Sequence, residues 1–208
     1  MSEYSVLGRR LHIAQHKLKA FLLFLLLSGS SHADDVLTQI TARLVKTPIT
    51  QGHFQQEKRL KILRKPLLSA GTFTYHQSKG VIWKTLTPVA SLLLVNKSRL
   101  LTAQGEQAVP AAFGEIFNAM LGGDLQRLSE GFVISGADQQ PAWRIELTPK
   151  DELLKKIIST MVLTGDNELR ALEIHEAGGN VARIELSQIS HPEQLSSEQE
   201  ADFERLSP

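Results

Sequence analysis

Hydrophobic and polar positions alternate most clearly over Leu67–Pro88, and the pattern predicts two strands joined by a short turn. Phe73 and Tyr75 fall on one face of the first strand, and the polar residues between and beside them fall on the other. The residues of Gln77–Gly80 suit a tight turn, and Trp83 lies inside the second strand. This stretch therefore carries an apolar, aromatic face and no catalytic motif.

The strand pattern recurs on both sides of this hairpin. Alternation starts at Gly52 and ends in a basic segment over Lys61–Lys65. The run Leu92–Val95 is apolar on both faces, so a further element must cover its second side. Later strands are expected over 132–134, 143–147, 155–163, 169–176 and 181–189. The last three form a meander, because the turns at 165–167 and 178–180 contain Gly and Asn, which accept positive φ.

Helical spacing appears in two places and weakly in a third. Apolar residues over 36–45 form a stripe behind the acidic pair Asp34 and Asp35, and Pro48 ends this helix. A second amphipathic helix follows Pro110 and stops at Gly122–Gly123, after which Asp124 is expected to cap a short helical piece. The Ser, Glu and Gln rich tail predicts a frayed helix, anchored by Phe203 and Leu206.

These elements define a fold class. At least eight antiparallel strands surround a helical interruption. We therefore expect a mainly β protein with helices (α+β), built on a large curved antiparallel sheet that forms a barrel-like or half-open structure. The helices pack against its apolar concave side. Residues 34–208 form one domain, since no repeat or linker divides them.

The first 33 residues have the pattern of a signal peptide. Arg9, Arg10 and two lysines precede the apolar run Ala20–Leu27, and small residues stand before a cleavage site after Ala33. The run is far shorter than the roughly 20 residues of a membrane span, which is the weaker alternative, as is export by the twin-arginine route. The chain has no Cys, so it is not itself a lipoprotein. It is expected to be soluble in the periplasm after cleavage.

Charge excludes a nucleic-acid partner. Removing residues 1–33 takes away four of the 23 basic residues and one of the 22 acidic residues. The remaining chain has 19 basic and 21 acidic residues, so its net charge is near −2. No basic patch of the size that nucleic acids require remains.

The search for catalytic chemistry is negative, so no enzyme is expected. The histidines at 53, 76, 175 and 191 stand singly on polar strand faces or in the tail, and there is no GxSxG motif. HExxH is also absent, so we expect no metal and no cofactor. Asp151 and Glu152 begin a helical turn, while Glu173 and Glu185 face solvent from neighbouring strands.

Several short motifs occur in a recognisable order. They are G-H-F-Q-Q-E-K at Gly52–Lys58, Ser69-x-Gly71, Gly80-x-x-Trp83, Pro88 and, later, Leu147–Lys150. In this order the chain resembles the LolA-type periplasmic carriers of outer-membrane lipoproteins, over most of its length after the signal peptide. The resemblance implies a monomeric half-open barrel with a helical lid over an apolar cavity. Such a carrier takes acyl chains from an inner-membrane exporter to an outer-membrane acceptor.

The hairpin turn departs from that family. The basic residue and proline of the better-known members would fall on Gln77 and Ser78, so the arginine that helps to hold their lid shut is missing and Lys79 is the only cation near it. The cargo can therefore be a lipoprotein or a free glycolipid or acyl pigment.

Candidate binding residues are the apolar ones expected on the concave face and on the lid. The cavity wall would contain Phe73, Tyr75, Trp83, Leu92, Leu94, Trp143, Ile145, Met161 and Leu163. The lid would contain Phe113, Ile116, Phe117, Met120 and Leu121. Each of them could equally be an ordinary core residue. A carrier must cover most of its cargo, because a long acyl chain in water costs roughly 10 kcal/mol at about 0.8 kcal/mol per methylene.

Two other functions fit the same pattern. The first is a periplasmic sensor or adaptor of this fold that binds a segment of a membrane protein. The second, a secreted hydrolase, would require His76 or His175 to act in catalysis.

Overall fold

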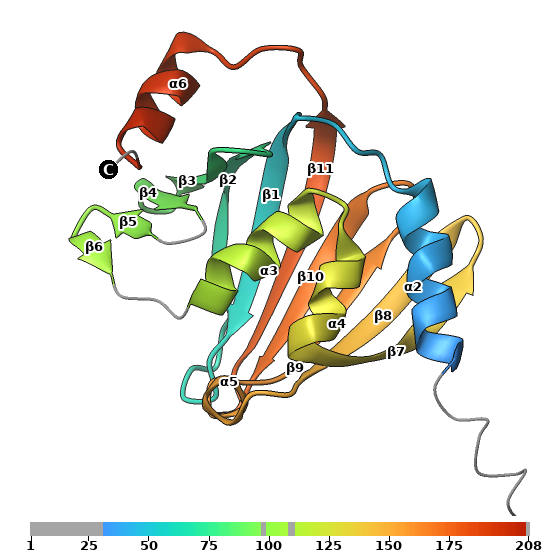
Figure 1. Ribbon diagram of the computed structural model, residues 1–208. Helices are drawn as coiled ribbons and strands as arrows, with labels where there is room; N and C mark the ends of the chain where they lie inside the picture. The colour runs from blue at the N-terminus through green and yellow to red at the C-terminus, as the bar shows by residue number, and fades with distance from the viewer. Residues whose placement is uncertain (1–30, 97–98, 108–110, 207–208) are drawn as a thin grey trace, which may run out of the picture. The chain divides into compact units, whose positions relative to one another are not determined.

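A single antiparallel sheet organises the computed structural model, which describes residues 31–96, 99–107 and 111–206 (Figure 1). The chain divides into two units after Asp35, and residues 36–208 are the unit that carries the sheet. Residues 1–30 lie outside the described part, so the signal peptide and its cleavage site remain a prediction.

The sheet has eleven strands. In chain order they are β1 Ile49–Arg59, β2 Leu67–His76, β3 Gly80–Thr87, β4 Ser91–Val95, β5 Leu100–Thr102, β6 Gly105–Gln107, β7 Phe132–Gln139, β8 Ala142–Pro149, β9 Ile158–Gly165, β10 Leu169–Glu176 and β11 Val181–Ser190.

The first and last long strands meet in the middle of this sheet. The strand order is β6-β5-β4-β3-β2-β1-β11-β10-β9-β8-β7, and every neighbouring pair is antiparallel. β6 and β7 do not pair with each other, so the sheet is not closed into a barrel. The predicted fold class, a mainly β protein with helices on an open, curved antiparallel sheet, is confirmed.

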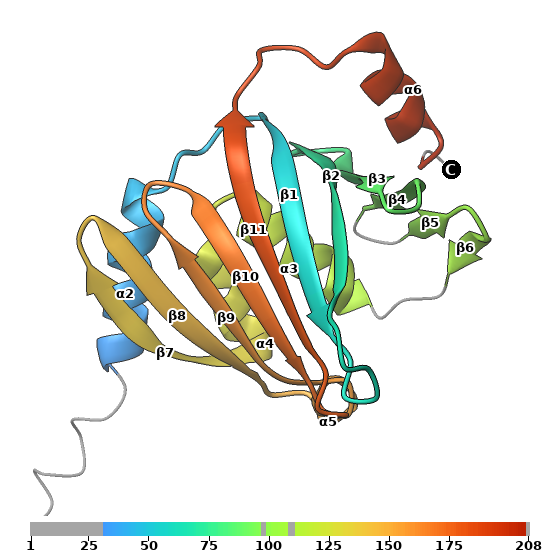
Figure 2. The same ribbon diagram turned by 180° about the vertical axis from the view of Figure 1, so that it is seen from behind.

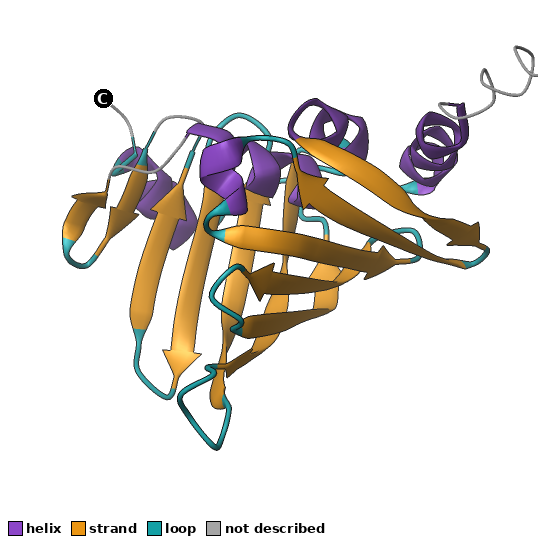
Figure 3. Cartoon of the chain, turned by 90° about the horizontal axis from the view of Figure 1, so that it is seen from below, coloured by secondary structure: helices purple, strands orange, loops and turns teal. Residues whose placement is uncertain are grey.

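The helices lie mostly on one face of the sheet. They are α2 Ser31–Arg43, α3 Ala111–Leu121, the 3₁₀ turn η1 Leu125–Arg127, α4 Leu128–Gly131, α5 Glu152–Lys155 and α6 Ser197–Glu204. In Figure 1, α3 and α4 cross in front of the strands, and Figure 2 shows the opposite face without them. Figure 3 shows the strands curving beneath the helices, so the covered face is the concave, inner one.

Alternation along the strands builds the core on this inner face. Phe54 of β1 stands opposite Gly71 of β2 and Leu186 of β11, and the side chains of Phe54 and Leu186 point inward. The same face continues to β7 through Leu172, Leu163, Ile145 and their neighbours. From the helix side, Leu37 and Ile40 of α2 and Met120 of α3 complete the cluster. An ion pair between Arg43 and Asp138 holds the end of α2 beside β7.

A smaller cluster occupies the outer face of β3 and β4. Ile82 and Leu94 are buried there against Phe203 of α6 and Leu206 after it. This confirms the expectation that a further element covers the doubly apolar run of β4. The helix begins with a capping box in which Ser196 and Gln199 bond each other's backbone N–H groups.

Some boundaries differ from the sequence prediction. The helical turn expected from Asp151 is present as α5, capped by the Asp151 carboxylate, which accepts from the N–H groups of Leu153 and Leu154; β9 therefore begins at Ile158 and not at Lys155. The expected turn after residue 135 forms later, since β7 continues to Gln139. Asp124 makes no capping bond and instead pairs with Arg127 at 3.0 Å. β5 and β6 were not expected, because three residues are too few for a periodic signal.

Within the described ranges no helix combines the length and the apolar character needed to cross a bilayer.

Candidate functional site

Three aromatic rings, those of Phe54, Phe73 and Trp83, cover the inner face where β1, β2 and β3 lie side by side. Phe73 stands opposite Trp83 in the β2–β3 ladder. The ring of Phe54 stacks on the indole of Trp83 with a centroid distance of 4.0 Å and an interplanar angle of 24°, and Phe73 follows at 6.1 Å. Stacked rings of this kind add about 0.5–1.5 kcal/mol to the burial of their area. The result is a rigid, apolar wall.

Two glycines make room for this wall. A methyl group at Gly52 would lie 2.9 Å from Cε1 of Phe73, and one at Gly71 would lie 2.9 Å from Cε1 of Phe54 and collide with the Lys84 carbonyl oxygen. Both glycines belong to the short motifs of the sequence. Glycine is needed at both positions because the rings of Phe73 and Phe54 lie against the neighbouring strand, in the space that any side chain there would occupy.

Helix α3 closes this wall from above. The ring of Phe117 meets Trp83 edge-on at a centroid distance of 6.4 Å and an angle of 63°. Ile116 and Met120 are buried in the main cluster, whereas Phe117 and Leu121 are half-buried and also pack near Tyr75. The helix therefore touches the aromatic wall directly, as a lid would.

The end of α3 turns sharply beside Tyr75. A methyl group at Gly122 would strike the Tyr75 hydroxyl, and Gly123 has φ +70, a left-handed conformation that favours glycine. The N–H of Gly122 donates to the Asn118 carbonyl at 2.9 Å. Burial raises the pKa of Tyr75, and the charge of Arg127 opposes that rise, so the phenol is neutral at physiological pH. A neutral phenol suits an apolar surrounding.

The other half of the inner face carries the second group of expected residues. Trp143 lies over Gly165 and donates from Nε1 to the Asp166 carbonyl oxygen at 2.7 Å. Ile145 and Leu163 are fully buried, and Met161 is 2 % exposed. These four side chains lie in the same cluster as Phe73, with Trp83 packed against it.

The expected site residues do not all come together. Phe73, Trp83, Trp143, Ile145, Met161 and Leu163 share the main inner cluster, with Tyr75 in a smaller cluster beside the lid. Leu92 and Leu94 lie elsewhere, on the outer face under α6, because Leu93 and Val95 take the inward positions of β4. The side chain of Phe113 lies outside the described part, while Ile116, Phe117, Met120 and Leu121 contact the inner face.

Sequence reasoning did not include Phe54 in the wall, although it makes the closest ring contact there. The available signal was its place in the alternating stretch after Gly52. It also did not include the inward residues of the central strands, such as Leu172, Ile184 and Leu186.

A slot of about 30 Å³ lies beside the C-terminal end of α3, lined in part by Phe73, Met120 and Leu121. This volume is about one water molecule's share of the liquid. At its edge, His191 bonds Glu168 through Nε2 at 2.6 Å and the Thr47 hydroxyl through Nδ1 at 2.9 Å. This slot is too small for an acyl chain.

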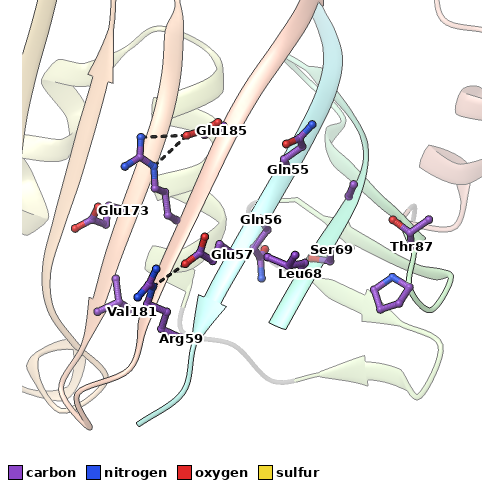
Figure 4. A pocket seen from close by; sticks show the side chains of 13 residues that line it. Gln55, Gln56, Glu57, Arg59, Leu68, Ser69, Thr87, Glu173, Val181 and Glu185 are labelled. Carbon is purple, nitrogen blue, oxygen red and sulfur yellow. Dashed lines mark hydrogen bonds and ion pairs between the residues drawn. The ribbon is translucent and has the colours of Figure 1, made fainter. Parts of the chain in front are cut away.

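A larger hollow of about 750 Å³ lies on the outer face, over β10, β11, β1 and β2 (Figure 4). Its charges are paired: Arg59 bonds Glu57 at 2.6 Å, and Arg183 bonds Glu185 at 3.0 Å. Apolar side chains, among them Leu68 and Val181, line the hollow beside these pairs.

The hairpin turn is tied to the C-terminal helix. Lys79, the cation expected near the lid, pairs instead with Glu200 of α6, and the His76 ring meets that of Phe203 at 6.0 Å. Lys84 pairs with Glu198, and the Gln199 amide donates to Thr74 at 2.8 Å. In this chain the turn therefore fastens α6 to the outer face.

Metal ligands do not gather in the part of the chain that the structure describes, where no three His, Asp or Glu side chains form a group able to hold an ion.

Residues 46–199 match the sequence profile of the family described as outer membrane lipoprotein carrier protein LolA. The chain belongs to the LolA family. The matched range begins just before β1 and ends inside α6, so it contains the whole sheet and the lid. No curated protein sequence matches the chain.

Three solved structures resemble the fold. A LolA superfamily protein from Nitrosomonas europaea has 10% identity and a TM-score of 0.43, over 80% of this chain and 96% of that one. A putative outer membrane lipoprotein-sorting protein domain from Vibrio parahaemolyticus has 11% identity and a TM-score of 0.44, over 84% and 98%. A DUF1329 family protein from Desulfovibrio piger has 12% identity and a TM-score of 0.45, over 83% and 96%. Likenesses at this level say nothing about a ligand.

Proposed function

We propose that this LolA-family protein is a periplasmic carrier that binds the acyl chains of a lipoprotein or another lipid between α3 and the inner face of the sheet. The main observation in support is the stacked aromatic wall of Phe54, Phe73 and Trp83, which the ring of Phe117 contacts edge-on. The cargo moves from an inner-membrane exporter to an outer-membrane acceptor, and the leader over residues 1–33 is removed after export.

We propose that the lid opens before cargo enters, since α3 packs directly on the aromatic wall and the slot of about 30 Å³ at its C-terminal end is far too small for an acyl chain. The half-burial of Phe117 and Leu121 and the glycine pair at 122–123 favour movement of α3 about its C-terminal end. Lifting α3 exposes the aromatic wall, and an entering chain covers it again. The cost of opening, a few kcal/mol, subtracts from the binding free energy and so permits release.

The turn of the β2–β3 hairpin differs from that of the better-known carriers, and this difference bears on which cargo the protein accepts. Lys79 pairs with Glu200 of α6 and Gln77 carries no charge, so neither holds the lid by charge. Packing of Phe117 and Leu121 holds it instead. We therefore propose that the protein accepts cargo with one or two acyl chains, such as a free glycolipid or acyl pigment, as readily as a lipoprotein.

Intrinsic fluorescence tests the site directly, because the chain contains only two tryptophans. Trp143→Phe leaves Trp83 as the single reporter under the lid, and Trp83→Phe leaves Trp143 as the reporter of the other half of the inner face. A fatty acid brominated along its chain should quench Trp83 on binding, since bromine quenches indole only at contact. Mass spectrometry of lipid extracted from the exported protein then identifies the natural cargo.

Two results would contradict the proposal. One is an exported protein that is free of lipid and shows no quenching of Trp83 by brominated fatty acid. The other is stoichiometric capture of a membrane-protein segment without lipid, which would favour a sensor or adaptor of this fold.

A further inference from the structure

The end of the molecule that carries the β1–β2 loop exposes apolar side chains that the carrier function does not use. Ile62 in this loop is 89 % exposed, and Leu68 at the start of β2 is 63 % exposed. Leu153 of α5 is 68 % exposed at the same end, and Leu63, Leu67 and Ile157 are between 44 % and 51 % exposed. We call these six side chains the apolar tip. Solvent-exposed apolar groups gathered in this way mark an interaction surface.

Hydrogen bonds show that these segments form one end and are not scattered. The backbone N–H of Lys61 donates to the Asn180 side-chain oxygen at 3.1 Å, which joins the β1–β2 loop to the β10–β11 turn. The N–H of Ala177 donates to the Ile157 carbonyl at 2.9 Å, which joins that turn to the segment after α5. Figures 1 and 2 both show the β1–β2 loop beside α5, at the opposite end of the sheet from the loop between α2 and β1.

Basic side chains surround the apolar tip. Lys61, Arg64, Lys65 and Lys156 are exposed, and none of them forms an ion pair within the described residues. The acidic groups nearby are engaged as well: Glu152 pairs with Lys155 at 2.7 Å, Glu176 pairs with Lys58 at 2.7 Å, and the Asp151 carboxylate caps α5 by accepting from the N–H groups of Leu153 and Leu154. The remaining four cations therefore give this end a positive charge, although residues 34–208 carry 19 basic and 21 acidic residues.

We propose that the apolar tip and its four cations dock on the surface of a membrane that contains anionic lipids. Protruding apolar side chains insert among headgroups and acyl chains, while lysine and arginine beside them attract anionic headgroups. The same composition suits a protein partner less well, because lysine is depleted from protein interfaces and the apolar groups here stand on separate turns. Neither Trp83 nor the lid takes part in this contact.

Vesicle binding tests the proposal with the protein purified from the periplasm after export. The probes are vesicles of phosphatidylcholine alone and vesicles that also contain phosphatidylglycerol, compared by flotation at low and high salt. The protein should bind the anionic vesicles at low salt, bind them weakly at high salt, and bind phosphatidylcholine only slightly.

Two variants and two controls separate the contributions. Lys61→Gln, Arg64→Gln and Lys65→Gln together should lower the affinity for anionic vesicles roughly 100-fold and remove most of the salt dependence. Ile62→Ser with Leu63→Ser should lower it at least about tenfold at both salt concentrations. Val133→Ser on β7, where the side chain is 59 % exposed, and Lys46→Gln at the other end of the sheet should leave binding unchanged.

Absence of binding to anionic vesicles, or equal binding by the tip variants and the wild type, would overturn the proposal. The test is independent of the carrier function, since all tip variants should still show bromine quenching of Trp83. If the wild-type protein bound anionic vesicles but showed no bromine quenching of Trp83, the carrier function would be refuted and the proposed docking surface would not.

Discussion

The edge of the Phe117 ring rests on the indole of Trp83, at a centroid distance of 6.4 Å, and joins the lid helix α3 to the strand beneath it. Trp83 also stacks on the ring of Phe54 in β1. The wall is therefore fixed by the sheet, and the Phe117 ring is one of several α3 side chains, with Ile116 and Met120, that pack against the inner face. An opening motion breaks these α3 contacts and leaves the stacking of Phe54 on Trp83 intact.

Phe117→Ala should loosen the lid without disturbing the wall. We expect the free energy of unfolding to fall by about 1–3 kcal/mol, and the affinity for a fatty-acid probe to rise up to about tenfold because opening costs less. Urea denaturation and probe titration measure the two quantities. Val133→Ala on the exposed edge strand is the control and should change neither. A weaker affinity for the probe would show that Phe117 binds cargo more than it holds the lid.

Gly71→Ala should destabilise the protein strongly. The new methyl group would collide with the Lys84 carbonyl oxygen and lie 2.9 Å from the Phe54 ring, so either the β2–β3 ladder or the wall must shift. We expect a loss of at least about 2 kcal/mol in urea denaturation. Gly178→Ala is the matched control, because a methyl group there meets nothing within 4 Å. Equal stability of the two variants would contradict this account.

Phe203→Ala should release α6 from the outer face while the sheet stays folded. Phe203 is 3 % exposed and packs with Ile82 and Leu94 in a cluster separate from the main core. Hydrogen exchange of the α6 amides should become fast, with little change in the β1 and β11 amides. Glu204→Ala, on the exposed side of the same helix, is the control. Cooperative exchange of the whole sheet would show instead that α6 is part of the global folding unit.

Acidification should weaken the docking of α6. Burial lowers the pKa of His76, the ammonium of Lys79 lowers it further, and Glu200 opposes them. The unfolded chain, with a His pKa of about 6.5, therefore binds the proton more readily than the folded chain, so the stabilisation is present above that pH and is lost as the pH falls through it. Glu198, whose pKa is lowered by its hydrogen bond from Lys84 and then by the charge of that lysine, adds a loss only below about 4.5.

The measurement is hydrogen exchange of the α6 amides at about pH 7.5 and about pH 5.5, corrected for the intrinsic exchange rates. Protection should fall at the lower pH in the wild type and stay constant in His76→Gln. Constant or greater protection of wild-type α6 on acidification would contradict the assignment to His76.

Strand period and turn chemistry were enough to predict most of the fold. β10 has the bounds that the sequence indicated, and the β2–β3 hairpin has its turn at the expected residues. The prediction was weakest where elements are short or locally determined. β5 and β6 are too short to show a period, and β9 begins at Ile158 and not at Lys155 because the expected helical turn after Asp151 extends to Lys155.

Placement of the site residues required tertiary information. Leu92 and Leu93 are chemically alike, and only the ladder that pairs Leu93 with Trp83 decides which of them points inward. The contact of Phe54 with Trp83 likewise depends on two strands separated by β2, so no local pattern in the sequence reports it. The sequence was enough to pick out the apolar residues of the strands, but not to say which of them lie on the inner face of the sheet and which on the outer face.

The pairing of β1 with β11 places the two ends of the sheet-forming chain next to each other at its centre. A chain that is synthesised or exported from its N-terminus must deliver almost all of its residues before this pair can form. Pairing of such distant segments is slow, because loop closure precedes any gain from contact. The sheet is therefore complete only when its last strand is available, and until then its two halves lack the pair that joins them.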